Sequence, residues 1–435
     1  MTLLESALEA SALLCLLAVL APEPTRRPAA VGTGVLLLVL AGAALATEGP
    51  RWQLTGVIGA GLIAMALSGF RVATQRPRTK RGYAALGLVL TLGFAGLLGG
   101  AAAIWGFRPL DLPDPQGQYA VGTRTAYWTD PARDEPATTA SDRRRVTAQI
   151  WYPTTLKGPA SPYLGRRPQI VAEGLGRSFG VPAFLFGEAV DGHGHSTENA
   201  PLPATGEKYG VVLFSPGLLS VRTQNTAWAE YLAARGYVVV ALDHPYDSAV
   251  TLTQDGRPLW SKVRATSDDE QGNRDADHLT AIRAQDLSFA LDRIEADAFF
   301  RHRLDTDRVA VTGHSAGGAA ALQAAAQDSR FRAAIDIDGL PRNNARPRQP
   351  VLALVAGDQQ DNVAYQQALT QVLAQNPLSR RITVKNTKHL SFTDAPFLLP
   401  GLPVLFGSAD RETAYTAMTG ATQTFLEAAF RNDLT

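Results

Sequence analysis

Residues Val309–Ala320 read VAVTGHSAGGAA, and this stretch decides how the chain is interpreted. The β-branched run Val309–Val311 predicts a strand, and the alanine-rich segment from Ala316 predicts a helix. Between them lies the pattern Gly-x-Ser-x-Gly with Ser315 at its centre. A strand, a sharp turn and a helix in this order form a nucleophile elbow, in which the glycines leave room for neighbouring backbone. The stretch therefore predicts that Ser315 is a nucleophile.

Length and charge set the broad limits. The chain has 435 residues, so two structural units are the first expectation. The 41 Lys and Arg residues balance 40 Asp and Glu residues, and a net charge of +1 does not indicate a nucleic-acid partner. Cys15 is the sole cysteine in the sequence, so neither an intramolecular disulfide nor a cysteine-based zinc site is expected. No cofactor or metal is expected.

Four apolar stretches come before the polar part of the chain. They are Leu3–Leu20, Ala30–Ala46, Leu54–Phe70 and Tyr83–Phe107. Each is close to the ~17–25 residues that cross a bilayer as a helix. Four in series distinguish this region from a signal peptide. The sequence predicts a transmembrane helical anchor over residues 1–107, a linker over 108–118 and a catalytic domain over 119–435.

Basic residues between the stretches predict the orientation of the anchor. Arg26 and Arg27 follow the first stretch, and Arg71, Arg76, Arg78, Lys80 and Arg81 follow the third. The positive-inside rule puts both of these loops in the cytoplasm. With four spans, we expect a multi-pass protein of the cell membrane whose catalytic domain is extracytoplasmic.

From Tyr119 onward, predicted strands alternate with predicted helices. The strands are Tyr119–Trp128, Val146–Tyr152, Val211–Ser215, Tyr237–Leu242, Val309–Thr312, Ala333–Ile337, Val351–Ala356 and Ile382–Lys385, and the helices are Thr223–Arg235, Ala276–Ala296, Ala316–Ala326, Val363–Ala374 and Thr413–Arg431. The first two strands are expected to pair antiparallel. The others predict a mostly parallel sheet with helices on both faces, which is an α/β-hydrolase fold. Residues 157–208 lack a steady period and are interpreted as an insertion or lid.

A serine nucleophile needs a base and an acid that orients the base. In this class of fold the order along the chain is Ser, then Asp or Glu, then His. His389 is the one histidine in the sequence after Ser315, and it is the predicted base. Asp338 and Asp358 each end a predicted strand, so both stay open as the acid. The geometry of the strand ends favours Asp338.

An oxyanion hole requires two backbone N–H groups. Ala316, directly after the serine, is one predicted donor. Leu218, in the turn after the strand Val211–Ser215, is the other, and Gly217 lets the backbone approach. His314 is expected to point away from the apex of the elbow and to pack beside it.

Two pairs of polar residues and two apolar segments also need an interpretation. His193 and His195 are interpreted as a flexible polar loop rather than a metal site, because no third ligand is evident. Asp243–His244 follows a strand and is expected either to brace the site or to turn the chain. Two apolar segments, Phe179–Phe186 and Leu390–Phe406, are expected either to contact an acyl chain or the bilayer, or to pack on each other.

Four segments together resemble the plasma-type platelet-activating factor acetylhydrolases and their bacterial membrane-anchored relatives. They are FSPGLLSVRTQNTAWAEYLAARGYVVVALDH (residues 214–244), GHSAGGAA (313–320), AAIDIDG (333–339) and HLSFTD (389–394). The resemblance covers the chain from about Tyr119 to the end. It implies Ser315 as nucleophile, Asp338 as acid and His389 as base, with Leu218 and Ala316 as oxyanion donors.

Two residues depart from the animal members of that family. Pro216 replaces a histidine, and Leu340 replaces the tryptophan that follows their acid. Because both residues lie near the predicted pocket, the identity of the substrate stays open.

The expected activity is that of a membrane-anchored serine ester hydrolase that cleaves short-acyl or lipid esters through an acyl-enzyme. Its expected partners are the ester substrate and the lipid bilayer. Two alternatives stay open. One is a polyester hydrolase or peptidase with the same triad, and the other is a non-catalytic binding or sensory domain on a hydrolase scaffold.

Overall fold

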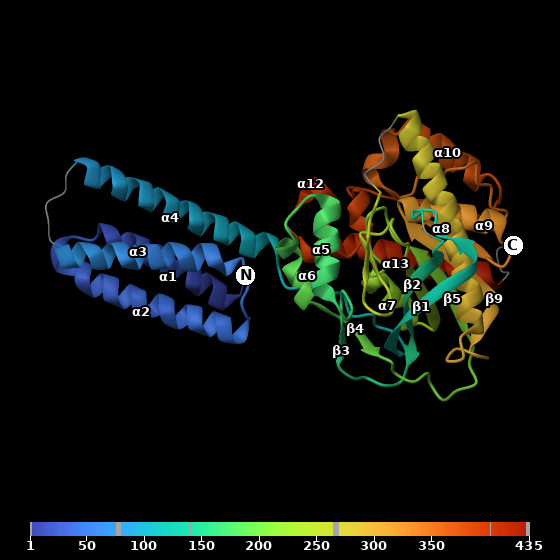
Figure 1. Ribbon diagram of the computed structural model, residues 1–435, viewed down its shortest axis with the longest axis horizontal. Helices are drawn as coiled ribbons and strands as arrows, with labels where there is room; N and C mark the ends of the chain where they lie inside the picture. Colours follow the sequence, from blue (N-terminus) through green and yellow to red (C-terminus); the bar gives the residue numbers. More distant parts are fainter. Residues whose placement is uncertain (1, 75–79, 140, 264–268, 401, 432–435) are drawn as a thin grey trace. The chain divides into compact units, whose positions relative to one another are not determined.

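The structure is a computed structural model that describes residues 2–74, 80–139, 141–263, 269–400 and 402–431. The chain divides into two compact units (Figure 1). The first is Met1–Arg108, grouped with Leu399–Gly401, and the second is Pro109–Leu398 with Leu402–Thr435. The division falls beside residue 107, where the sequence analysis expects the anchor to end.

The first unit consists of long apolar helices. In its described part these are α1 (Leu3–Leu20), α2 (Glu23–Thr47), α3 (Leu54–Thr74) and α4 (Lys80–Gly106). All four are long and apolar enough to cross a membrane. Buried side chains such as Leu16, Leu37 and Val57 hold them together in one cluster. Each helix contains one of the four predicted apolar stretches, apart from a residue or two at an end.

The connection between α1 and α2 differs from the prediction. Arg26 and Arg27 were expected in a loop, but they lie in the first turns of α2, and Arg26 Nε donates to the Ala21 carbonyl at 3.0 Å. The helix begins early because Pro24 is tolerated in a first turn, where the N–H groups have no partner in the helix. Arg76 and Arg78, which also carry the orientation argument, lie outside the described residues.

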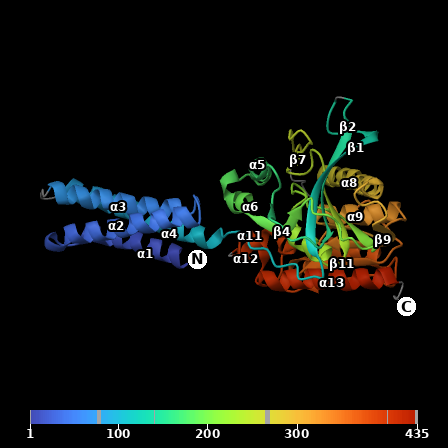
Figure 2. The ribbon, with the colours of Figure 1, turned by 90° about the horizontal axis from the view of Figure 1, so that it is seen from below.

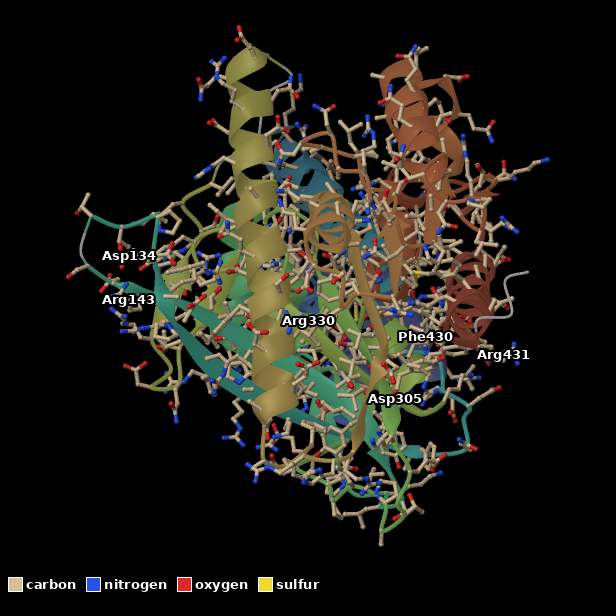
Figure 3. The ribbon with its side chains drawn as sticks, turned by 90° about the vertical axis from the view of Figure 1, so that its right-hand side faces the viewer. Asp134, Arg143, Asp305, Arg330, Phe430 and Arg431 are labelled. Atoms are coloured by element: carbon tan, nitrogen blue, oxygen red, sulfur yellow. The ribbon has the colours of Figure 1, made fainter. Side chains whose placement is uncertain are left out.

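The second unit is built on a mixed, mostly parallel sheet. Over the described residues its strand order is β12-β11-β10-β9-β5-β6-β2-β1-β4-β3. The bounds are β1 (Ala120–Asp134), β2 (Arg143–Thr154), β3 (Ala160–Pro162), β4 (His193–Glu198), β5 (Tyr209–Ser215), β6 (Tyr237–Asp243), β9 (Leu304–His314), β10 (Ala333–Ile337), β11 (Val351–Ala356) and β12 (Arg380–Val384). Strands β12 to β6 are parallel, whereas β1 and β2 form an antiparallel hairpin. The ion pair between Asp134 and Arg143 lies at the tip of this hairpin (Figure 3).

Helices cover both faces of this sheet (Figure 2). On one face lie α7 (Thr226–Ala233) and α13 (Arg411–Arg431), and on the other lie α8 (Glu270–Ala296), α9 (Ala316–Gln327) and α10 (Val363–Leu373). Val211 and Val212, neighbours on β5, belong to the two opposite cores, as the alternation of side chains along a strand requires. The predicted α/β-hydrolase fold class is confirmed. Helix α8 begins six residues before its predicted start at Ala276.

The segment 157–208 is more ordered than its sequence suggests. It contains β3, α5 (Pro168–Phe179), the short helices η1 (Ala183–Phe186) and α6 (Gly187–Asp191), and β4. Strand β4 pairs with β1, and Leu164 and Val171 are buried in the core. Apart from α5, the elements of this segment are only three to six residues long, too short for a steady period. A lid role for this segment stays a prediction.

The other short elements lie in loops of the second unit. The hairpin β7 (Val250–Leu252) and β8 (Pro258–Trp260) follows β6. The remaining helices are η2 (Gly357–Asp361), η3 (His389–Phe392), α11 (Ala395–Leu398) and α12 (Pro403–Phe406). The predicted linker 108–118 is partly packed, because Leu112 is buried in the core of the second unit.

Candidate active site

Ser315 lies at the apex of a tight turn between β9 and α9. Its backbone adopts φ 57° and ψ −123°, a region that side-chain-bearing residues rarely enter. The two glycines of the motif are required by close backbone contacts. A Cβ at Gly313 would lie 2.2 Å from the backbone of Gly317, and one at Gly317 would lie 1.9 Å from the Ser215 carbonyl oxygen. The predicted elbow is therefore present.

Asp338 and His389 form a hydrogen-bonded pair. Asp338 follows β10, and its Oδ2 lies 2.7 Å from His389 Nδ1. Its Oδ1 accepts the N–H of Ala356 at 2.7 Å, which fixes the carboxylate from a second side. The Asp338 side chain is fully buried, whereas that of His389 is 37% exposed. With Nδ1–H donating to the carboxylate, Nε2 of His389 is free to accept a proton.

The second acid that the sequence left open lies elsewhere. Asp358 is exposed in η2, and among the described residues no hydrogen bond or ion pair joins it to His389. Asp338 is held close to the base because its N–H donates to the Leu354 carbonyl on β11 at 2.8 Å.

The two predicted oxyanion donors lie on segments that flank the serine. Ala316 is the first residue of α9, so its N–H has no acceptor within the helix. Leu218 belongs to the turn after β5, which we call the oxyanion turn (Pro216–Leu219). A Cβ at Gly217 in this turn would lie 3.6 Å from the Ser315 Cβ, so the turn packs directly against the nucleophile. Leu219 has φ 60°.

The sequence analysis missed a buried arginine beneath the oxyanion turn. Arg283 of α8 is fully buried. It donates to the Pro216 carbonyl at 2.5 Å and pairs with Asp247 at 2.6 Å. A buried charge of this kind is stable because it is paired and hydrogen-bonded. Arg283 lies 67 residues from Pro216 along the chain, so no local pattern in the sequence indicated their contact.

A second buried group braces the end of β5. His244 Nε2 lies 2.9 Å from Ser215 Oγ, and His244 Nδ1 lies 2.8 Å from Asp286 Oδ2. All three side chains are fully buried, and burial lowers the pKa of His244. This arrangement resembles a triad, but substrate cannot reach it. Of the two roles considered for Asp243–His244, bracing the site is the one that this geometry fits.

His314 packs against the predicted base. Its ring centroid is 4.5 Å from that of His389, and its Nε2 lies 3.0 Å from the His389 carbonyl oxygen. The ring therefore packs beside the elbow, as the sequence analysis expects, and it does so against the predicted base.

His193 and His195 lie in β4 rather than in a flexible loop, so that prediction is wrong. The N–H of His195 donates to the buried Glu230 carboxylate at 2.9 Å, and its Nε2 lies 3.0 Å from the Leu112 carbonyl. Across the described parts of the chain, no cluster of three or more metal-ligating side chains occurs.

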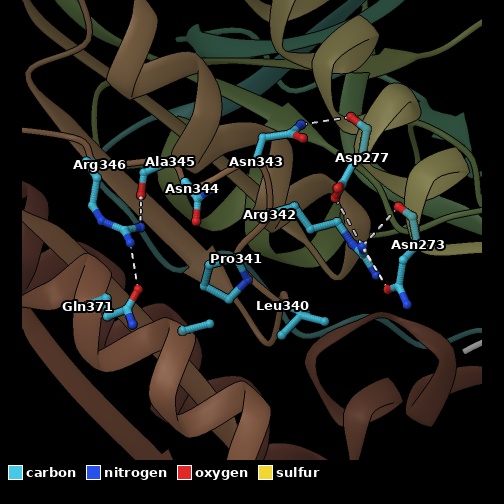
Figure 4. A pocket seen from close by; sticks show the side chains of 11 residues that line it. Asn273, Asp277, Leu340, Pro341, Arg342, Asn343, Asn344, Ala345, Arg346 and Gln371 are labelled. Atoms are coloured by element: carbon cyan, nitrogen blue, oxygen red, sulfur yellow. Dashed lines mark hydrogen bonds and ion pairs between the residues drawn. The ribbon is translucent and has the colours of Figure 1, made fainter. Parts of the chain in front are cut away.

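A polar cavity of about 550 Å³ opens beside the segment that follows Asp338 (Figure 4). Its lining includes Leu340–Arg346, and Arg342 donates to Asp277 at 3.2 Å across it. None of the predicted catalytic residues lines this cavity.

Comparisons with known proteins show the family. The family described as platelet-activating factor acetylhydrolase, isoform II, matches residues 107–433. The platelet-activating factor acetylhydrolase of Canis lupus familiaris is 27% identical over 296 residues, which are 58% of this chain and 65% of that protein. Cutinase est2 of Thermobifida alba is 29% identical over 164 residues, which are 37% of this chain and 45% of that protein. The match therefore spans less than two thirds of either relative.

A solved structure is similar as well. The ferulic acid esterase from Streptomyces cinnamoneus superposes with a TM-score of 0.62 at 27% sequence identity, covering 75% of this chain and 94% of that one.

The two candidate acids can be separated by matched substitutions. We expect Asp338→Asn to lower kcat for p-nitrophenyl butyrate by about 10³–10⁴-fold, because a neutral amide no longer holds the imidazole in the productive tautomer. Asp358→Asn is the control and should leave kcat near that of the unsubstituted chain. Loss of activity in Asp358→Asn with retention in Asp338→Asn would reverse the assignment.

Proposed function

The chain belongs to the platelet-activating factor acetylhydrolase, isoform II, family, and from this premise we propose that it is a membrane-anchored serine hydrolase of short-acyl or lipid esters. The observation that carries the proposal is the 2.7 Å bond between Asp338 and His389 beside the Ser315 elbow. Family membership supports an esterase, and the geometry supplies the groups for the chemistry.

The proposed reaction runs through an acyl-enzyme. Ser315 Oγ attacks the ester carbonyl while His389 Nε2 takes its proton, and Asp338 stabilises the imidazolium. The N–H groups of Leu218 and Ala316 stabilise the oxyanion. His389 then returns the proton to the departing alcohol. In the second half, His389 takes a proton from a water molecule as the water oxygen attacks the acyl carbon, and His389 then returns that proton to Ser315 Oγ as the acid product leaves.

Lipid esters are favoured as substrates by the apolar side chains exposed on the second unit. Phe179, Phe184 and Val404 are each more than half exposed. They belong to the two segments in which the sequence analysis expects contact with an acyl chain or a bilayer. Apolar side chains on the surface of an esterase are suited to a substrate that is itself apolar.

A second candidate is a polyester hydrolase with the same triad. The similarity to cutinase est2 over 164 residues supports it. A peptidase or a non-catalytic domain has no comparable observation in its favour.

The nucleophile and the substrate class are tested together on the full chain in detergent. We expect hydrolysis of p-nitrophenyl acetate and butyrate, and a loss of at least about 10³-fold in Ser315→Ala. Ser379→Ala is the matched control, since Ser379 accepts a hydrogen bond from the Val351 N–H far along the sheet and should not affect turnover.

The preferred substrate separates the two candidates. Faster release of acetate from a 2-acetyl phospholipid than of products from a polyester film supports the lipid esterase, and the opposite order supports the polyester hydrolase. Turnover retained in Ser315→Ala would contradict both.

The proposed location is a cell membrane, with the second unit outside the cytoplasm. The four long apolar helices support a membrane, and the cluster of basic residues around Arg71 and Lys80 supports the orientation.

Cysteine labelling tests the orientation in intact cells. In a Cys15→Ser background, an impermeant maleimide should label Lys157→Cys, an exposed position of the second unit. It should label Lys80→Cys, exposed at the start of α4, only after the cells are opened. The reverse pattern would contradict the proposed orientation.

A further inference from the structure

We propose that Gln224 and His314 are positioning residues that hold the oxyanion turn and the base in register with each other. This inference rests on the proposed function, in which Leu218 N–H and His389 act on the same substrate. Gln224 and His314 do not touch the reacting atoms in this scheme. They act through a chain of three hydrogen bonds.

The first bond supports the oxyanion turn. Gly217 N–H donates to Gln224 Oε1 at 2.8 Å. The planar peptide unit that carries the Gly217 N–H also carries the Pro216 carbonyl, which accepts from Arg283, so this unit is held at both ends directly before Leu218. The turn needs this support, since Leu219 holds a backbone conformation that is costly for a residue with a side chain.

The second and third bonds follow from the first. Because Gln224 Oε1 accepts from Gly217, its amide nitrogen faces His314 and donates to Nδ1 at 2.8 Å. His314 Nδ1 is then without a proton, so Nε2 carries it and donates to the His389 carbonyl at 3.0 Å. Burial lowers the pKa of His314 well below its ordinary value, which agrees with a neutral ring.

Gln224 also holds the loop that carries the base. The N–H of Asp394, five residues after His389, donates to the Gln224 backbone carbonyl at 3.0 Å. The Asp394 carboxylate in turn accepts the N–H of Thr226 at 2.6 Å, at the start of α7. Gln224 therefore contacts the oxyanion turn through its side chain and the loop after His389 through its main chain.

This series of hydrogen bonds depends on both the Gln224 and the His314 side chain, because each bond has a fixed direction. Each link has one donor and one acceptor, and a reversed amide would turn the Gln224 NH₂ group toward the Gly217 N–H. Loss of either side chain breaks this side-chain connection, and only Arg283 and the Gln224 main chain are then certain to hold the oxyanion turn and the base loop. A shift of about 1 Å in a catalytic group can cost about 10²-fold in rate.

A double-mutant cycle tests this inference on the full chain in detergent. Gln224→Met and His314→Leu remove the polar atoms at similar side-chain size. We expect each to lower kcat for p-nitrophenyl butyrate about 10–100-fold with KM within about twofold, because the misplaced donor acts mainly in the transition state. The double variant should lose no more than the poorer single variant, because one substitution already interrupts the chain.

Two further variants complete the test. Gln423→Met is the matched control, since Gln423 is also a half-buried glutamine that accepts from Tyr231 and donates to Glu427, and it should keep full kcat. His314→Gln, whose amide can both accept and donate, should recover part of the kcat that His314→Leu loses.

The outcomes are distinguishable. Losses that multiply in the double variant, unchanged kcat in Gln224→Met, or equal kcat in His314→Gln and His314→Leu overturn the inference. If the melting temperature shows that His314→Leu does not fold, the kcat of Gln224→Met compared with that of Gln423→Met tests the inference. An unsubstituted chain that hydrolyses no ester overturns the proposed function itself.

Discussion

Ser315 holds a backbone conformation that costs a residue with a side chain about 1–3 kcal/mol, and the rest of the site is built around that turn. The conformation persists because β9 on one side and α9 on the other are both buried in the same core. The end of β5 also lies against the elbow, so close to Gly317 that no side chain would fit at that position. The strained turn at Ser315 therefore requires β5 to lie next to β9.

The register of the parallel strands then brings Asp338, the proposed acid, close to Ser315. Ile337 on β10 pairs with His314 on β9, so the next residues, Asp338 and Ser315, leave the sheet side by side. The Ser315 N–H donates to the Ile337 carbonyl at 2.9 Å and ties the two turns together. The proposed base, His389, begins η3 after the short connection 385–388 that follows β12, and the Asp338 carboxylate holds its imidazole there.

The local sequence predicted the strands and helices that form this arrangement. It did not predict the contacts between residues far apart along the chain. The strands around Val211 and Val309 followed from composition, and Ser315 and His389 followed from the motif and the order of residues along the chain. Whether Asp338 or Asp358 meets His389 depends on which strand end the base loop reaches, and spacing alone does not encode that.

The errors have physical causes of the same kind. His193 and His195 were placed in a loop because β4 is short and pairs with β1, a partner distant in sequence. Arg283 was missed because its partners lie on loops far away in sequence, and an arginine in a polar helix is ordinarily a surface residue. The central claim is that Ser315 is the activated nucleophile of this chain. Its most direct test is to treat the purified full chain with a fluorophosphonate and map the adduct by mass spectrometry: a single adduct on Ser315 is predicted, and an adduct on another residue, or none on a chain that hydrolyses esters, would contradict it.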